Sequence, residues 1–215
     1  MKFKHLTSAF LMALFFIQAP GQNPSPKAQR SVNDAVSSHK FTFSISYLSF
    51  ANFGQEKTNT HHYELSVGYQ LTPNDKIGIK AATWKLFAPM GIQFWDPLFL
   101  NESEFFPGRL NEKGIGVTYQ RMLWKGLFAA IEVMPLFKTY LDEDNTKTGN
   151  GFKLYTIWHA GYHLPLFKGR IYIEPQIHCN YWPVDTNIPQ GFKEKENKWV
   201  NYFLFEPNVY IGVNF

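Results

Sequence analysis

The sequence predicts an all-β protein, an eight-stranded antiparallel up-and-down β-barrel. Apolar and polar residues alternate with a period of two in eight separate segments, which is typical of strands with one apolar and one polar face. The connections between these segments run long, short, long, short, long, short, long. The last segment shows the alternation most clearly, with apolar residues at every second position back from Phe215. This layout predicts tight turns on one rim of the barrel and long loops on the other.

Each predicted strand is supported by its own alternation. In the second strand, for example, Tyr63, Leu65 and Val67 alternate with Glu64 and Ser66. The predicted strands cover about residues 40–50, 61–71, 75–86, 114–120, 127–134, 154–163, 170–178 and 202–215. Because consecutive strands are joined directly, the order along the chain is also expected to be the order around the barrel.

The connections differ in length and in composition. Pro, Asn, Lys and Gly mark tight turns at about 72–74, 124–126 and 166–169. Three of the longer connections lie at about 87–113, 141–150 and 180–201, and the second of these is acidic and polar. Within the last of them, residues 191–199 read as an ordinary solvated hairpin of mixed charge. These long segments are expected on the extracellular rim.

Two kinds of eight-stranded barrel fit this pattern. In a soluble barrel of lipocalin type the apolar face fills the interior, whereas in a membrane barrel it faces lipid. Glycines separate the two, because the polar face carries Gly68, Gly78, Gly116, Gly161 and Gly212. Repeated glycines weaken a water-facing strand, but they make room inside a narrow barrel. The polar face is therefore predicted to line the lumen.

The two chain ends fit a secreted membrane protein. Residues 1–21 carry two lysines, an apolar run and small residues before Gln22, which predicts a cleaved signal peptide. Residues 22–39 are polar and aperiodic, so they are interpreted as a flexible periplasmic segment, and residues 40–215 as the barrel. The terminal strand ending at Phe215 resembles the closing strand of small outer-membrane β-barrels of Gram-negative bacteria. The resemblance implies an outer-membrane location, contact with outer-membrane lipids, and recognition of Phe215 by the barrel assembly machinery.

Composition excludes several other classes. The chain carries 21 basic and 17 acidic residues, so nucleic acid is not expected as a partner. Cys179 is the only cysteine, which excludes an intramolecular disulfide. After the predicted signal no apolar run reaches about 18 residues, so any membrane crossing must use strands. Aromatic residues make up 18% of the chain, as membrane barrels need for two interfacial girdles.

A group of polar side chains is predicted to meet inside the barrel. Its members lie on the polar faces of their strands, most of them near mid-height: Glu64, Lys80, Glu132, His159, Glu174, Gln176 and Glu206. Turn positions place Lys80 opposite Ser66 with Glu64 on its diagonal, and Gln176 opposite His159. The simpler interpretation is one buried network that fills the lumen, because buried charges need partners. The alternative is an acid/base site or a gated ion path, favoured by the excess of carboxylates.

Neither catalysis nor metal binding has a complete signature. Some outer-membrane barrels modify lipid A, and deacylases of that kind place a serine two residues after a histidine. Here His159, His163 and His178 are followed at that spacing by Gly161, Pro165 and Asn180. His159 and His163 lie roughly 13 Å apart at strand rise, too far to share one metal ion. No catalytic residue, cofactor or metal is therefore expected.

The connection at 87–113 is unusually apolar for a loop. Its large apolar residues include Phe94, Trp95, Phe99, Phe105 and Phe106. Asp96-Pro97 predicts a helix start, with a short helix over 97–106 stopped by Pro107-Gly108. Such a segment is expected to cover the barrel mouth, to anchor in the lipid interface, or to bind a lipid or an envelope-protein partner.

Two functional hypotheses follow. The first is a non-catalytic outer-membrane barrel with a polar, side-chain-filled lumen that serves envelope structure, adhesion or limited, porin-like passage of small solutes. The second is a lipid-modifying or lipid-binding barrel, of the lipid A deacylase or acyltransferase type.

Overall fold

The computed structural model describes residues 40–53, 60–99 and 101–215. The predicted signal peptide, 1–21, and the predicted periplasmic segment, 22–39, lie outside these residues. Within them no helix is long and apolar enough to cross a membrane.

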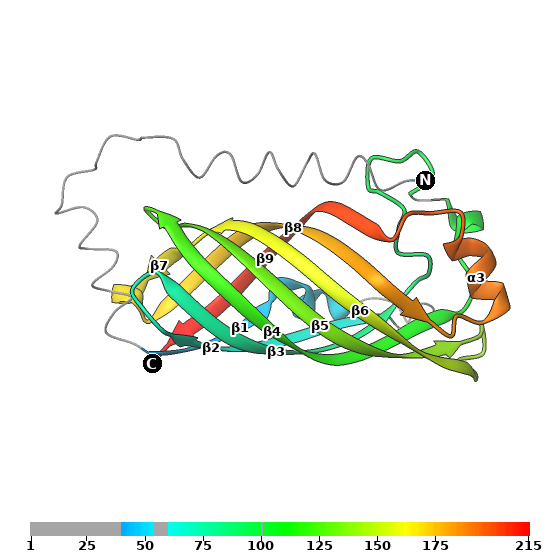
Figure 1. Cartoon of the computed structure of the whole chain (residues 1–215), viewed down its shortest axis with the longest axis horizontal. Coiled ribbons are helices and arrows are strands. Elements are labelled where there is room, and N and C mark those ends of the chain that lie inside the picture. Colours follow the sequence, from blue (N-terminus) through cyan, green and yellow to red (C-terminus); the bar gives the residue numbers. More distant parts are fainter. Residues whose placement is uncertain (1–39, 54–59, 100) are drawn as a thin grey trace.

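The described chain forms a closed antiparallel β-barrel (Figure 1). Consecutive strands pair from β1 to β6, β1 also pairs with β9, β9 with β8, and β8 closes the wall against β6. The short β7 follows β6 after His163 and pairs with the first residues of β8. β6 and β7 therefore occupy one strand position together, and the wall has eight strands. The predicted fold class is confirmed. The strands are β1 (Phe41–Ser46), β2 (His61–Gln70), β3 (Asp75–Leu86), β4 (Arg109–Trp124), β5 (Leu127–Leu141), β6 (Lys147–Tyr162), β7 (Leu164–Leu166), β8 (Ile171–Thr186) and β9 (Tyr202–Asn214).

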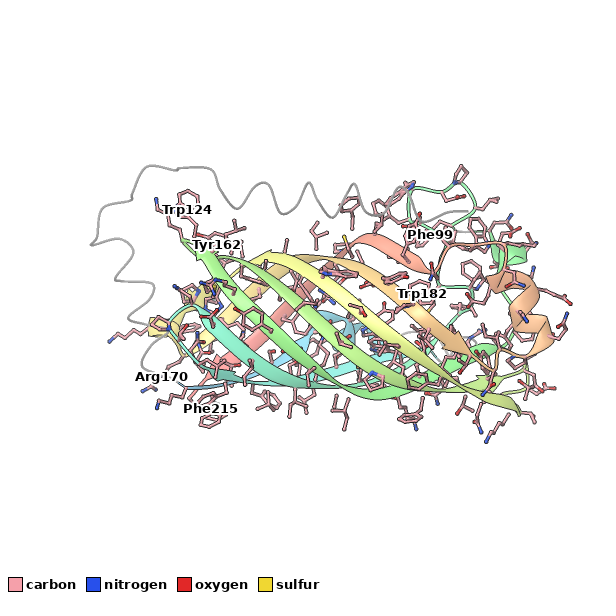
Figure 2. All side chains as sticks on the ribbon, viewed as in Figure 1. Phe99, Trp124, Tyr162, Arg170, Trp182 and Phe215 are labelled. Carbon is pink, nitrogen blue, oxygen red and sulfur yellow. The ribbon has the colours of Figure 1, made fainter. Side chains whose placement is uncertain are left out.

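The two faces of the wall are distributed as in a membrane barrel. Aliphatic side chains cover the outside, and Ile79, Ile115 and Val117 are each about 60% exposed (59%, 65% and 64%). Figure 2 shows the aromatic residues Trp124 and Tyr162 at the turn end, and Phe215 at the same end on the opposite side of the barrel. The glycines face inward: a Cβ on Gly212 would lie 2.2 Å from the Tyr172 ring, for example. The lipocalin alternative therefore does not describe this barrel.

The tight turns and the C-terminus lie at one end of the barrel, and the long connections lie at the other (Figure 1). Lys125 and Gly126 both have positive φ, which lets a two-residue turn join β4 to β5. The 3-10 turn η4 (Phe167–Gly169) joins β7 to β8. At the opposite end, which we call the mouth, lie the 3-10 turn η3 (Glu102–Glu104) and the helix α3 (Gln190–Glu196).

The first strand is shorter than predicted. Residues 40–50 were expected to be extended, but β1 ends at Ser46 and the 3-10 segment η2 (Tyr47–Phe53) follows. The Ser46 hydroxyl accepts a hydrogen bond from the Leu48 backbone N–H at 3.2 Å, which turns the chain out of the strand. The pairing of β1 with β9 therefore ends at Tyr210. Among the described residues, no strand pairs with this edge of β9 between Tyr210 and the mouth.

The loop between β3 and β4 crosses to that edge of β9. The Gln93 side-chain amide donates to the Tyr202 carbonyl at 2.7 Å and accepts from the Leu204 N–H at 2.9 Å. One side chain therefore replaces part of the missing strand pairing. The helix predicted over 97–106 is wrong. Asp96 instead caps a turn through the Leu98 N–H, and Asn101 caps η3 through the Ser103 N–H, because these short polar side chains favour tight turns.

Two other connections differ from prediction. Half of the segment 141–150 is strand, because β5 and β6 pair as far as Leu141 and Lys147 and leave only a turn at 142–146. Gly151 lets β8 lie close to this end of β6, since a Cβ there would lie 2.5 Å from the Thr186 carbonyl oxygen. The segment 191–199 is not a solvated hairpin but mostly the helix α3, which buries Phe192 against Phe106 and Tyr140. Tertiary packing at the mouth selects the helix.

Strand irregularity also changes one side-chain assignment. Phe203 and Phe205 were expected on the same lipid-facing side of the last strand. A register shift against β8 and a positive φ of 58° at Phe205 form a bulge, so Phe205 stays 54% exposed while Phe203 packs into the lumen. An extra residue in one strand reverses the faces beyond it.

Candidate functional site: the filled lumen and the mouth cavity

A turn-side cluster fills the barrel next to the tight turns. Glu174 on β8 is its centre and accepts hydrogen bonds from Gln120 at 3.0 Å and from His163 Nδ1 at 2.9 Å. The Lys76 ammonium lies 3.6 Å from the same oxygen and above the Tyr172 ring. Glu174 is 4% exposed, so this carboxylate is held by three partners in place of water.

A central cluster lies above it and is organised around Lys80 on β3. The Lys80 Nζ is 2.6 Å from Glu132 and 3.6 Å from Glu64, and it donates to the Tyr210 hydroxyl at 2.7 Å. Tyr210 in turn donates to Glu64. The residues join β2, β3, β5 and β9 across the lumen.

Two histidines extend the central cluster. His62 Nε2 lies 3.0 Å from Glu64, and His159 Nε2 lies 3.6 Å from Glu132. His159 Nδ1 pairs with Gln176 at 3.1 Å, although the residue opposite His159 is His178. The expected pairing of His159 with Gln176 was two residues out of register because the turn at η4 is longer than assumed; the even offset leaves both side chains on the inner face.

The predicted lumen residues are therefore distributed among three groups. Glu64, Lys80, Glu132, His159 and Gln176 meet in the central cluster, and the expected opposition of Ser66 to Lys80 is present. Glu174 belongs to the turn-side cluster. Glu206 stands apart, where Asn180 donates to it at 2.6 Å and His178 Nδ1 lies 3.9 Å away. A cavity of about 60 Å³ between the turn-side and central clusters has room for a few water molecules.

An apolar layer follows the central cluster toward the mouth. It was not predicted, because the alternation of the sequence indicated a polar lumen throughout. Met134 and Leu136 are 0% exposed, so these two side chains do not line a water-filled channel. The layer consists of Ala82, Trp84, Met134, Leu136, Tyr155, Ile157 and Trp182, with Leu86, Met90 and Phe203 packed against it. Trp182 lies in the mouth half of the barrel in Figure 2.

A third ionic group, the mouth cluster, lies beyond the apolar layer. Lys153 is 2.7 Å from Glu112 and 3.9 Å from Asp185, and Lys138 pairs with Asp185. These residues were also missed, although a signal existed. Lys138 continues the inward parity of Glu132 on β5, and Lys153 continues that of His159 on β6.

The mouth itself is covered by an apolar cap. Ala88, Leu110, Tyr140 and Phe192 are buried there, with Phe106 and Ile188 packed on them. Burial raises the pKa of the Glu196 carboxyl on α3 above its ordinary value, and Lys153 and Lys138 oppose that rise.

The remaining aromatic residues of the apolar loop lie over β9 and beside the cap. Phe94 and Trp95 are in edge contact and pack on Phe203 and Phe205, respectively. Phe99, which Figure 2 labels near the mouth, also contacts Phe203. Phe94 and Trp95 stay about half exposed, at 48% and 51%. Phe94, Trp95 and Phe99 thus form one aromatic surface with β9. Of the other two predicted loop residues, Phe105 contacts Phe87 beside this surface and Phe106 packs in the cap.

A mouth cavity of about 860 Å³ lies under this loop. Its wall is mainly apolar and includes Leu86, Phe99, Phe105 and Phe203, and it reaches Tyr155, Asn180 and Glu206 in the lumen. The volume is in the usual range for small-molecule sites. Sequence reasoning did not find this cavity, because it depends on the early end of β1 and on the path of the loop.

Phe215 completes the wall at the turn end. Its backbone N–H and carbonyl exchange hydrogen bonds with Phe41, both at 2.9 Å, and its ring stacks on the Phe41 ring at 6.1 Å. Phe215 is 61% exposed on the outer surface. Removing it would therefore shorten the contact that joins the first and last strands.

No protein-family model and no curated protein matches the chain. Among solved structures, Neisserial surface protein A (NspA) is similar at 11% identity with a TM-score of 0.41, covering 82% of this chain and 94% of that one. CarO2 of Acinetobacter baumannii is similar at 11% identity with a TM-score of 0.36, covering 82% and 97%.

Proposed function

We propose that the chain is a Gram-negative outer-membrane β-barrel that serves envelope structure or adhesion and does not conduct through its lumen. The observation that carries this proposal is the order of the lumen layers. Two ionic clusters are followed by an apolar layer with fully buried Met134 and Leu136, then by the mouth cluster and the cap. A hydrated solute would have to displace packed aromatic rings and break buried ion pairs to pass.

The location is supported by independent features. The exposed aliphatic band with aromatic residues at the turn end suits a lipid bilayer. The predicted signal peptide at 1–21 and the terminal Phe215 suit export and assembly into an outer membrane. Outer-membrane lipids and the barrel assembly machinery are the partners that this proposal requires.

Conductance tests the sealed lumen. We expect the folded protein in planar lipid bilayers to show no stable current steps above the lipid background, and liposomes that contain it to swell no faster than empty ones. A bona fide porin reconstituted in the same way provides the positive control. Reproducible single-channel steps from the folded wild type would contradict a sealed lumen and favour small-solute passage.

Deletion of Phe215 tests the location and the assembly signal. We expect fewer barrels in the outer-membrane fraction and more degradation in the periplasm, because the last strand loses both its aromatic end and its pairing with Phe41. Heat-modifiable mobility in gel electrophoresis measures the folded fraction. Phe215→Tyr is the matched control, since it keeps an aromatic terminal residue. Normal insertion of the deletion variant would contradict the proposed signal.

A second candidate function is ligand binding at the mouth, favoured by the 860 Å³ cavity. Lipid modification by a serine-type mechanism has less support. His159 contacts Gln176 and Glu132, and His163 contacts Glu174, so the partners that the structure gives these rings are not nucleophilic hydroxyls.

A further inference from the structure

We propose that the mouth cavity binds an amphipathic cation, with an apolar body against the aromatic wall and an ammonium head at Glu206 and Asn180. This inference rests on the second candidate function and names the ligand chemistry of that cavity. The two ends of the cavity differ in chemistry. Phe99, Phe105 and Phe203 line the part nearest the loop, while Asn180 and Glu206 line the part inside the barrel.

The inner end offers hydrogen-bond acceptors that the fold does not fully use. Asn180 is 3% exposed, and its side-chain amide N–H donates a hydrogen bond to Glu206 at 2.6 Å. Its Oδ1 atom is buried and has no hydrogen-bond partner within the described chain. A buried acceptor without a partner is destabilising, so a ligand that donates a hydrogen bond there would be favoured.

Glu206 adds charge to this acceptor site. Its side chain is 32% exposed, and its nearest basic group is His178 Nδ1 at 3.9 Å. Within the described residues, no lysine or arginine forms an ion pair with it. Each of the carboxylates of the turn-side and central clusters, Glu64, Glu132 and Glu174, has a lysine within 4 Å. Glu206 is thus the lumen acid whose cationic partner can come from outside the chain.

The other charged residues that line the cavity are compatible with a cationic ligand at Glu206. The Arg109 guanidinium lies 4.0 Å above the Phe87 ring and donates to the Pro107 and Gly108 carbonyls. It is therefore held by the loop backbone at the rim. Glu102, which also lines the cavity, adds a second negative charge.

The aromatic wall suits the same ligand. Organic cations are attracted to aromatic faces as well as to carboxylates, and quaternary ammonium groups are recognised in this way. A hydrocarbon or aryl body would remove apolar surface of Phe99, Phe105 and Phe203 from water. An anionic or purely apolar ligand would leave Glu206 and the Asn180 oxygen without compensation.

Equilibrium dialysis with a matched pair of probes tests the proposal. The first probe is a phenylalkyl-ammonium salt, whose NH₃⁺ group can donate to Asn180 Oδ1, and the second is its uncharged isostere with a methyl group in place of the ammonium. The whole barrel is held in nanodiscs of zwitterionic phospholipid, and binding to empty nanodiscs is subtracted. We expect the cation to bind about tenfold or more tightly than the isostere, as a charged contact in an apolar site would give.

Three variants separate the contributions. Glu206→Gln should weaken the cation about tenfold and leave the isostere unchanged, because the amide keeps the shape but not the charge. Phe99→Ala should weaken both probes. Glu143→Gln, on the exposed turn between β5 and β6, is the matched control and should change neither. Heat-modifiable mobility shows that each variant is folded, and Phe99→Ala tests the cavity if Glu206→Gln does not fold.

Each opposite result has a distinct meaning. Equal affinity for the two probes, or an equal loss in Glu206→Gln and Glu143→Gln, would overturn the cationic head. Failure of both probes to bind the folded wild type would overturn the cavity as a site for this ligand class. Neither result bears on the sealed lumen, which the conductance experiment tests separately.

Discussion

Lys80→Met is expected to lower the free energy of unfolding of the barrel by about 3–5 kcal/mol, the usual cost of removing one partner from a buried ion pair. Lys80 lies between two carboxylates, at 2.6 Å from Glu132 and 3.6 Å from Glu64, and its side chain is 3% exposed. Methionine keeps most of the volume but leaves both acids and the Tyr210 hydroxyl without the ammonium.

Reversible urea unfolding in lipid vesicles, followed by tryptophan fluorescence, measures this effect. Lys193→Met on the exposed surface of α3 is the matched control and should change the free energy by less than about 0.5 kcal/mol. The double variant Lys80→Met with Glu132→Gln should recover part of the loss, because it removes one of the two uncompensated charges. A loss in Lys80→Met no larger than in the control would show that the central cluster is hydrated rather than buried.

Ile79→Arg is expected to destabilise the barrel by about 2–4 kcal/mol, as an arginine near the middle of the lipid-facing surface does. Ile79 is 59% exposed and points outward, between Val67 and Val117 on the neighbouring strands. In a soluble barrel an arginine on this exposed face would have almost no effect. The substitution therefore distinguishes a lipid-facing from a water-facing outer surface.

The same unfolding measurement in vesicles applies to this variant. Thr146→Arg, in the exposed turn between β5 and β6, controls for the added charge and should be close to neutral. An equally small effect at Ile79 would mean that this side chain faces water, and it would overturn the membrane assignment.

Local patterns in the sequence were sufficient for the class of fold. Period-two alternation depends only on successive side chains pointing to opposite faces, so it identifies strands and their two surfaces without knowledge of the partners. Glycines on the polar parity then identified the inner face, and Gly161 and Gly212 indeed leave space for Gln176, Phe128 and Tyr172. The tight turns followed from Gly, Pro and Asn, whose backbone preferences are also local.

The composition of the lumen was only partly predictable. Charged residues such as Glu64, Lys80 and Glu132 were found because they alternate with apolar residues and so lie on the polar face of their strands. The apolar layer was missed because Trp84, Met134 and Tyr155 resemble lipid-facing residues in type, and only the closed wall shows that they pack on one another. The lengths of β5 and β6 were underestimated for a related reason: pairing in the sheet outweighs the weak strand preference of Lys, Asn and Gly.

The chain's sequence alone therefore determined the strand order, the two faces and the polar character of much of the lumen. The tertiary structure decided the early end of β1, the bulge at Phe205, the helix α3 and the path of the apolar loop. Together these features create the mouth cavity and leave Glu206 beside it without a lysine or arginine partner in the described chain. They depend on contacts between residues far apart in sequence, such as the hydrogen bond of Gln93 to Tyr202. A local sequence pattern does not show which distant group will hydrogen-bond to a given strand edge.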